Sequence, residues 1–194
     1  MAKDKFPRIV TPEFRAIYVW TEKPQPPLQE GQEAKYKVGM MFDKKNKKVI
    51  AGLKEIIATA DGLLKERFPK LKAKQFQAWL RNGNTDDTLS ENPLFKGMYY
   101  AQAKTKDAPG IVDKHRKLIV DPDEFYAGCY AIASCAMFTY DKAGNKGAGL
   151  LLNNLMKLRD GDRISGKPDP ESDFEEVEVP EDDDLLGGDD DIPF

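Results

Sequence analysis

The sequence predicts a mainly β fold, a small antiparallel barrel or sandwich into which one amphipathic helix is inserted. Three observations favour this class over a doubly wound α/β fold. Several segments alternate apolar and polar residues, only one long segment has helical periodicity, and strands do not alternate with helices along the chain. A length of 194 residues and a hydrophobic content of 40% suffice for one such domain followed by a tail.

The first part of the chain contains two predicted strands separated by a loop. Residues 8–20 alternate and are rich in β-branched and aromatic residues, which predicts a strand with Pro12 at its start or at a bulge. Residues 21–32 contain three prolines and a glycine and are expected to form a loop. Residues 34–42 predict a half-buried strand, because lysines alternate there with Tyr36, Val38, Met40 and Phe42.

The predicted helix extends from about Lys47 to Phe68, where the apolar residues change to helical spacing. Lysines occupy other positions of this segment, and Pro69 ends it. The apolar positions are Val49, Leu53, Ile56, Ile57, Ala60 and Leu64. This pattern is typical of a surface helix that covers a core with one face.

The middle of the chain is expected to be less regular. Residues 70–96 predict a loop with a helical turn around Phe76–Leu80, and short strands are expected at 97–104 and 111–120. We find no internal repeat.

A long hairpin is predicted near the end of the body. Residues 128–140 form its first strand, the Gly- and Asn-containing segment 141–147 its turn, and residues 148–157 its returning arm. The two cysteines, Cys129 and Cys135, are six residues apart with no second pair. This spacing excludes a disulfide framework and a CxxC zinc site, and it favours two reduced thiols in the core.

The residues that most enzymes need are missing or isolated. His115 is the single histidine, so no second His or Cys completes a metal site with it. Asp86, Asp87 and Glu91 lie among turn-forming residues, where solvated acids are the expected interpretation. The phosphate-loop, dinucleotide and nucleophile-elbow motifs are also missing. We therefore predict a protein that is not an enzyme and needs no cofactor or metal.

Charge is divided between two parts of the chain. Residues 169–194 contain thirteen of the 33 acidic residues and none of the 30 basic ones. Residues 1–168 therefore hold 20 acidic against 30 basic residues, a net charge of +10 beside −13 in the tail. Such segregation predicts a polyanion as the partner of the body and an acidic interaction tail. The tail has too few apolar residues to offset its ordering entropy and is expected to be disordered.

Neither a membrane span nor a secretory leader is predicted. The longest weakly polar stretch, Cys129 to Tyr140, is too short to cross a bilayer, and the N-terminus lacks an apolar segment. The chain is expected to be intracellular.

Basic and aromatic residues are interleaved in the body, as nonspecific binding of single-stranded nucleic acid requires. Lysine and arginine neutralise phosphates, and aromatic rings stack on bases of any sequence. The candidates are Lys35, Tyr36, Lys37, Trp79, Arg81, Tyr99, Tyr100, Lys104, Lys106, Tyr140, Lys142 and Lys146. In a strand, half of the aromatic rings face the core, so the surface as a whole is better supported than any one of these residues. The lysines at 44–48 fit a solvated helix start better than a phosphate track.

The last six residues resemble the C-terminal tip of bacterial single-stranded DNA-binding proteins, the SSB family. They are Asp189, Asp190, Asp191, Ile192, Pro193 and Phe194. In the resembled tip, the Phe ring enters an apolar pocket of a partner and the terminal carboxylate meets a basic side chain. The resemblance implies that host or phage replication and repair proteins bind this tip.

The body resembles the phage-encoded single-stranded DNA-binding proteins of the phage T7 type. The resemblance is carried by residues 128–166 and by the layout of a basic body before an acidic tail. It implies an OB-fold over residues 1–168, a five-stranded barrel that binds single-stranded DNA across one face, and a site of action in the cytoplasm of the infected bacterial host. The helix at 47–68 is then an insertion or a link between barrel strands.

Together these observations predict a sequence-nonspecific single-stranded DNA-binding protein whose tail, residues 169–194, competes with DNA and recruits partners. Removal of the tail is expected to permit binding of duplex DNA, and a homodimer is among the assemblies left open. An alternative from a different class also remains. The protein could be a decoy that mimics the SSB tip to occupy host repair proteins, with an RNA-binding or other basic body.

Overall fold

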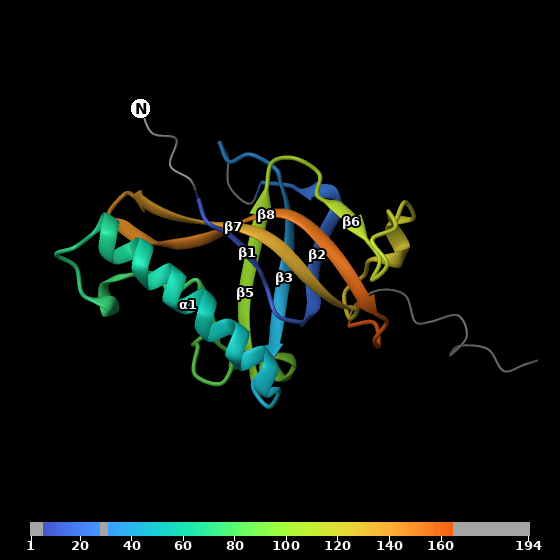
Figure 1. Cartoon of the computed structure of the whole chain (residues 1–194), viewed down its shortest axis with the longest axis horizontal. Coiled ribbons are helices and arrows are strands. Elements are labelled where there is room, and N and C mark those ends of the chain that lie inside the picture. The colour runs from blue at the N-terminus through green and yellow to red at the C-terminus, as the bar shows by residue number, and fades with distance from the viewer. Residues whose placement is uncertain (1–5, 28–30, 165–194) are drawn as a thin grey trace, which may run out of the picture.

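A ring of five long strands forms the centre of the computed structural model, which describes residues 6–27 and 31–164. The order around the ring is β7-β2-β3-β5-β8, and β8 pairs with β7 again, which closes the barrel (Figure 1). The strands are β2 (Phe14–Gln25), β3 (Lys35–Asp43), β5 (Met98–Thr105), β7 (Tyr130–Lys142) and β8 (Asn145–Arg159). Most pairings are antiparallel, while β8 runs parallel to β5. The predicted mainly β barrel is confirmed.

Three short strands extend this ring. They are β1 (Arg8–Val10), which pairs with β7, β4 (Leu80–Asn82), which pairs with β5, and β6 (Gly110–Val112), which runs parallel to β8. Short 3₁₀ turns lie at Ala73–Gln75, Pro93–Phe95 and Pro122–Glu124.

The helix α1 (Lys47–Arg67) connects β3 to the segment that leads into β4. It begins after Asn46, whose side-chain oxygen accepts hydrogen bonds from the N–H groups of Lys48 and Val49. Lys65 and Arg67 in its last turn complement the helix dipole. One stripe of the helix is buried against the barrel, namely Val49, Leu53, Ile56, Ala60 and Leu64. The predicted helix is confirmed, except that Ile57 remains 37% exposed.

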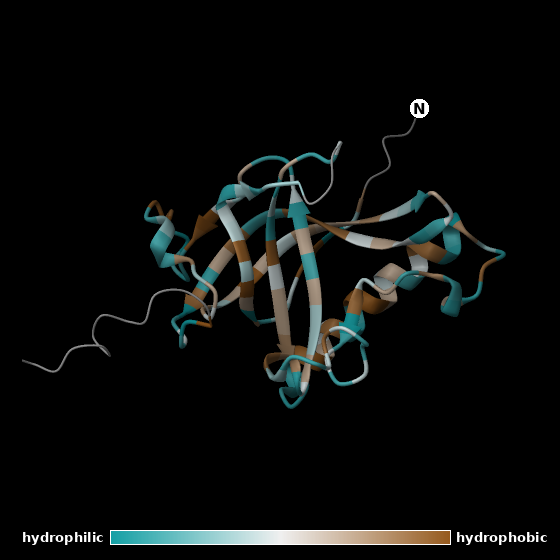
Figure 2. Ribbon diagram, turned by 180° about the vertical axis from the view of Figure 1, so that it is seen from behind, coloured by the Kyte–Doolittle hydropathy of each residue, from teal (hydrophilic) through white to brown (hydrophobic). Residues whose placement is uncertain are grey.

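The core fills the barrel and the space beneath α1. Apolar side chains alternate along the strands, and the alternation of hydropathy is visible in Figure 2. Cys129 and Cys135 are buried here as free thiols, as predicted, and burial raises the pKa of Cys135 to about 12. A second, smaller cluster lies on the outer face, where Leu89 and Phe95 cover Ile17, Met41 and Tyr100.

The predicted loop at 21–32 is wrong for its first part, because β2 continues to Gln25. Pro24 is tolerated there because β2 pairs with β7 only at Phe14 and Arg15, which leaves the later part of that edge open in the described structure. The regular register with β3 is also interrupted between Trp20 and Gln25. The missing N–H of the proline therefore costs no ladder hydrogen bond.

Two predictions for the middle of the chain are also wrong. A helical turn does not form around Phe76–Leu80, because Leu80 begins the short strand that pairs with β5. The strand predicted at 111–120 ends at Val112. The carboxylate of Asp113 accepts hydrogen bonds from the N–H groups of His115 and Lys117, which turns the chain back on itself.

The long hairpin is confirmed, with a shorter turn than predicted. Strands β7 and β8 extend to Lys142 and Asn145, and only Ala143 and Gly144 remain between them. Both residues have positive φ, 49° and 84°, as a two-residue hairpin turn of the favoured hand requires. The acidic tail and the tip, residues 169–194, lie outside the described residues.

We expect Gly39→Ala to lower the free energy of unfolding by about 1–3 kcal/mol, because a Cβ there would lie 2.7 Å from the Ile17 carbonyl oxygen and 3.1 Å from the Tyr100 ring. The matched control is Gly62→Ala in α1, where nothing lies within 4 Å. This substitution should raise the free energy of unfolding by about 0.5–1 kcal/mol. Urea unfolding of the two variants measures both effects, and equal stabilities would contradict the packing at Gly39.

Candidate nucleic-acid interface

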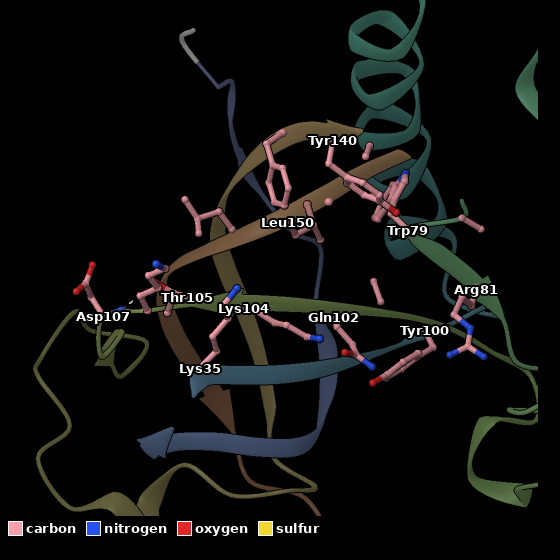
Figure 3. Close-up of a pocket in the computed structure, with 17 residues that line it drawn as sticks. Lys35, Trp79, Arg81, Tyr100, Gln102, Lys104, Thr105, Asp107, Tyr140 and Leu150 are labelled. Carbon is pink, nitrogen blue, oxygen red and sulfur yellow. Dashed lines mark hydrogen bonds between the residues drawn. The ribbon is translucent and has the colours of Figure 1, made fainter. Parts of the chain in front are cut away.

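One edge of β5 pairs with β3, and its other edge is shared by β4 and β8, which diverge from each other. Leu80 and Asn82 of β4 face residues 99–101 of this edge, and β8 pairs with Ala103 and Lys104. A groove of about 560 Å³ opens in this fork, on the outer surface of the barrel (Figure 3). We call it the β5–β8 groove. Its lining comprises Lys35, Ala78, Trp79, Arg81, Tyr100, Ala101, Gln102, Lys104, Thr105, Lys106, Asp107, Phe138, Tyr140 and residues 148–151.

Aromatic rings form one side of the β5–β8 groove. Met137 points into the core. Phe138 and Tyr140 follow it by one and three residues in β7, so strand alternation places both on the outer face of the barrel. Each ring packs over a glycine of β8. A Cβ on Gly149 would lie 2.7 Å from the Phe138 ring, and one on Gly147 would lie 2.7 Å from the Tyr140 hydroxyl. Because neither glycine has a side chain, the far ends of the two rings can lie over β8.

The row of aromatic rings formed by Tyr140 and Phe138 continues beyond the groove to Phe6. The centroid of Phe138 lies 6.3 Å from that of Tyr140 and 6.3 Å from that of Phe6, which is 51% exposed. Trp79 faces Tyr140 from the segment before β4, as Figure 3 shows. Rings at this spacing can stack on successive bases of a single strand.

Lysines lie across from these rings. Lys35 and Lys104 are exposed in the groove, and Lys106 forms an ion pair of 2.6 Å with Glu33. Lys37 is the register partner of Lys104 on the outer face of β3. Burial, and then the charge of Lys104, lower the pKa of Lys37 below its ordinary value. These ammonium groups repel one another, so an anion placed between them would be stabilised.

The end of the groove at Tyr100 is less accessible. Tyr100 is 1% exposed, because Tyr18 and Phe95 pack against its ring with centroids 6.4 and 5.2 Å away. Burial raises its pKa to about 12. Arg81 is held by a bidentate ion pair, in which Nε donates to Asp86 Oδ2 at 2.7 Å and Nη2 donates to Oδ1. The Tyr100 ring is therefore covered, and the Arg81 charge is partly balanced.

Two exposed aromatic residues that sequence reasoning missed extend the surface onto β2. Tyr18 and Trp20 are 43% and 38% exposed, and Trp20 is the register partner of Lys37. The Lys37 Nζ lies 5.6 Å from the centroid of the Tyr18 ring. If β2 alternated without interruption, Tyr18 and Trp20 would lie on the same buried face as Phe14. A bulge at Tyr18, where φ is 50°, reverses the phase of the strand and turns them outward.

Seven of the twelve candidates line the β5–β8 groove: Lys35, Trp79, Arg81, Tyr100, Lys104, Lys106 and Tyr140. Lys37 lies beside it. The other four lie elsewhere. Tyr36 shares a strand face with the buried Val38, and Tyr99 lies under Lys44, whose Nζ is 4.7 Å from its ring. Lys142 is exposed at the hairpin end, and Lys146 pairs with Asp141 at 2.8 Å.

The acidic residues at 86–91 form a turn. Asp86 accepts hydrogen bonds from the N–H groups of Thr88 and Leu89, as expected for a turn-forming acid. Within residues 6–27 and 31–164, the structure has no cluster of three His, Cys, Asp or Glu side chains that could hold a metal ion. None of the helices in this part of the chain is long and apolar enough to span a membrane.

The sequence model of a family described as "Enterobacter phage Enc34, ssDNA-binding protein" matches residues 7–186. The chain belongs to this family. As a member of the Enc34 family it is a phage-type single-stranded DNA-binding protein, and the resemblance of its body is confirmed. The match ends at residue 186, so the resemblance of the C-terminal tip remains a prediction. A comparison with curated protein sequences finds no match.

Solved structures agree with the fold of the Enc34 family. The single-stranded DNA-binding protein from bacteriophage Enc34 in complex with ssDNA aligns with a TM-score of 0.69 at 19% identity, over 81% of this chain and 89% of that chain. The gp2.5 protein encoded by bacteriophage T7 aligns with a TM-score of 0.60 at 17% identity, over 91% and 100%. At these identities the likeness shows the shared fold, and the OB-fold prediction is confirmed. The family consists of binding proteins.

The ion pair between Arg81 and Asp86 predicts a pH dependence of stability. A hydrogen bond from Arg81 lowers the pKa of the Asp86 carboxyl to about 2, below its ordinary value of 3.8. The stabilisation is therefore present above the ordinary value and is lost as the pH falls through about 2. Between pH 4 and 2, the free energy of unfolding should fall more steeply for the wild type than for Asp86→Asn.

Urea unfolding at a series of pH values measures this difference. Asp87→Asn is the matched control, since Asp87 is exposed and forms no ion pair within the described residues. Its curve should follow that of the wild type. Parallel curves for the wild type and Asp86→Asn would contradict the prediction.

Proposed function

We propose that the protein coats single-stranded DNA without sequence preference during phage DNA replication, recombination or repair, in the cytoplasm of the infected host. The supporting observation is one continuous outer surface that joins the β5–β8 groove to Tyr18 and Trp20 on β2. Rings and lysines alternate across it, from Tyr140 and Trp79 through Lys104 and Lys37. No chemistry beyond binding is needed for this role.

The proposed interface is nonspecific for a physical reason. Lysine ammonium groups bind phosphates, which are identical in every nucleotide, and aromatic faces stack on any base. Among the lining side chains that could reach base edges, Arg81 is already paired with Asp86, and the Thr105 hydroxyl is buried and accepts from the Asp107 N–H. Affinity should therefore depend on salt far more than on sequence.

Lys104→Ala and Trp20→Ala test the interface. We expect Lys104→Ala to weaken binding of a dT oligonucleotide and to reduce the slope of log affinity against log salt by about 1, since one phosphate contact is lost. Trp20→Ala should cost about 1–3 kcal/mol of binding free energy with little change in slope, because stacking releases no counterion. Fluorescence anisotropy over a range of salt concentrations measures both quantities.

Lys48→Ala is the control for these variants, because Lys48 is an exposed lysine in the first turn of α1, outside the groove. It should bind as the wild type does. Unchanged affinity and slope in both Lys104→Ala and Trp20→Ala would refute the proposed surface.

The acidic tail is proposed to compete with DNA for this surface. Residues 169–194 carry a charge of −13, which complements the +10 of the body. A random coil of about 26 residues has a root-mean-square span of about 25–30 Å. A body of 168 residues has a radius of gyration of about 15 Å, so the tail can reach the groove of its own molecule. Its local concentration is then on the order of millimolar.

Deletion of residues 169–194 should raise the affinity for single-stranded DNA on the order of tenfold at low salt, because an intramolecular competitor is removed. The gain should shrink as salt rises, and binding of duplex DNA should become measurable. Electrophoretic titration of the full chain and the deletion variant against both forms of DNA measures these changes. Equal affinities of the full chain and the deletion variant at low salt would contradict the proposed competition.

The tip, Ile192-Pro193-Phe194, is proposed to recruit host or phage replication and repair proteins. An aromatic ring, a restricted proline and the aspartates that precede them together suit an apolar pocket with a basic rim. When DNA occupies the groove, the displaced tail offers this tip to partners. A homodimer is compatible with this role, since a tail can also reach a second copy.

The second candidate function is the decoy, which mimics the SSB tip while the body binds RNA or serves another role. The tip resemblance alone favours it. The deletion variant distinguishes the two functions, because a body that binds single-stranded DNA weakly, next to a tip that binds partners strongly, would support the decoy.

A further inference from the structure

A second groove lies beside α1, on the other side of the segment that precedes β4. It has a volume of about 620 Å³, slightly larger than the β5–β8 groove. We call it the α1 groove. One wall is a stripe of the helix formed by Ile50, Lys54, Ile57, Asp61 and Leu64, which are three or four residues apart. The facing wall is chiefly Leu71, Phe76 and Leu80.

The α1 groove is apolar and open. Ile57 fits the apolar pattern of the helix, yet it is 37% exposed, while the other positions of that pattern are buried against the barrel. Phe76 is held in place by Phe68, with ring centroids 5.9 Å apart. A volume of this size is typical of pockets that enclose a small ligand or a few side chains.

The rim of the α1 groove is mainly basic. Lys54 and Lys65 lie on it, opposed by one acid, Asp61. Neither lysine forms an ion pair within the described part of the chain. Three further lysines, at 70, 72 and 74, are exposed and alternate in sequence with the lining residues Leu71 and Ala73. A suitable occupant combines an apolar end with negative charge.

The end of this chain has that chemistry. Residues 165–194 lie outside the described structure, and they include three aspartates followed by Ile192, Pro193 and Phe194. Thirty residues can extend up to about 100 Å, so the end can reach any surface of its own body. We infer that Ile192-Pro193-Phe194 docks in the α1 groove of its own molecule, with the Phe194 ring between Ile57 and Phe76.

This docking deepens the proposed competition of the tail with DNA, and it rests on that proposal. Trp79 lines both grooves, and the segment 77–81 is the partition between them. The segment is fixed to β8 by the N–H of Gln77, which donates to the Lys146 carbonyl oxygen at 2.8 Å. With the tip in the α1 groove, the aspartates that precede it lie beside the partition. From there they reach the lysines of the β5–β8 groove.

The docked tip has a regulatory consequence. The docked Ile192-Pro193-Phe194 holds the acidic segment near the β5–β8 groove. The tail therefore competes with DNA for that groove through a defined contact as well as through its charge. The same contact hides Phe194 from partner proteins until DNA displaces the tail. Hence a change at Ile57 alters DNA affinity although Ile57 lines only the α1 groove and lies outside the proposed DNA surface.

A double-mutant cycle in the full chain tests the docking. Ile57→Glu places a carboxylate in the α1 groove, and Phe194→Ala removes the ring. Each should raise the affinity for a dT oligonucleotide at low salt by about threefold to tenfold, and the double variant should gain no more than either single variant. Ala58→Glu is the matched control, because Ala58 is the exposed neighbour outside the groove and receives the same charge. It should not raise the affinity.

A direct readout accompanies the cycle. The chain has two tryptophans, so Trp20→Phe leaves Trp79 as the single tryptophan, whose emission can be excited selectively. In this background without DNA, Phe194→Ala should shift the Trp79 emission to longer wavelength, because an apolar neighbour is lost. Identical emission spectra, or additive effects in the cycle, would overturn the docking.

The outcome also separates this inference from the proposal on which it depends. If deletion of residues 169–194 raises DNA affinity while Ile57→Glu and Phe194→Ala do not, the competition stands and the docking is wrong. If the deletion itself changes nothing, the competition proposal fails first.

Discussion

The double pairing of β8 is the constraint on which the rest of the structure depends. β8 pairs antiparallel with β7 along almost its whole length, and it also pairs in parallel with β5 at Ala103 and Lys104. This second contact closes the barrel and buries its core. It also ends after two residues, so that β4 takes the remaining edge of β5. The groove exists because these two partners diverge.

Local backbone irregularities then decide which side chains face that groove. The bulge at Tyr18 reverses the phase of β2, so that Val19 packs toward the core while Tyr18 and Trp20 face solvent. Glycines at 147 and 149 leave room for Tyr140 and Phe138 to lie over β8. In both cases a local feature of the backbone decides whether an aromatic ring is buried in the core or faces the proposed DNA surface.

Electrostatics acts at two ranges in this protein. Within the body, the ion pairs of Arg81 with Asp86 and of Lys106 with Glu33 are local. Between body and tail, the separation of +10 from −13 can act over the whole molecule, within the limit that salt screening sets. Lys37 and Lys104 are adjacent in register on the outer face, so an anion between them meets two positive charges.

The sequence by itself determined the features that depend on neighbours in the chain. Alternation predicted β3, and strands were also expected at the positions of β5 and β7. Helical spacing predicted α1, and the charge count predicted a basic body with an acidic tail. Only the tertiary structure decided which candidates meet in one groove, since that depends on pairings across the barrel. Tyr99 and Tyr100 show the reason. They are adjacent in sequence, but strand alternation sends Tyr99 toward α1 and Tyr100 to the outer face, where Phe95 covers it.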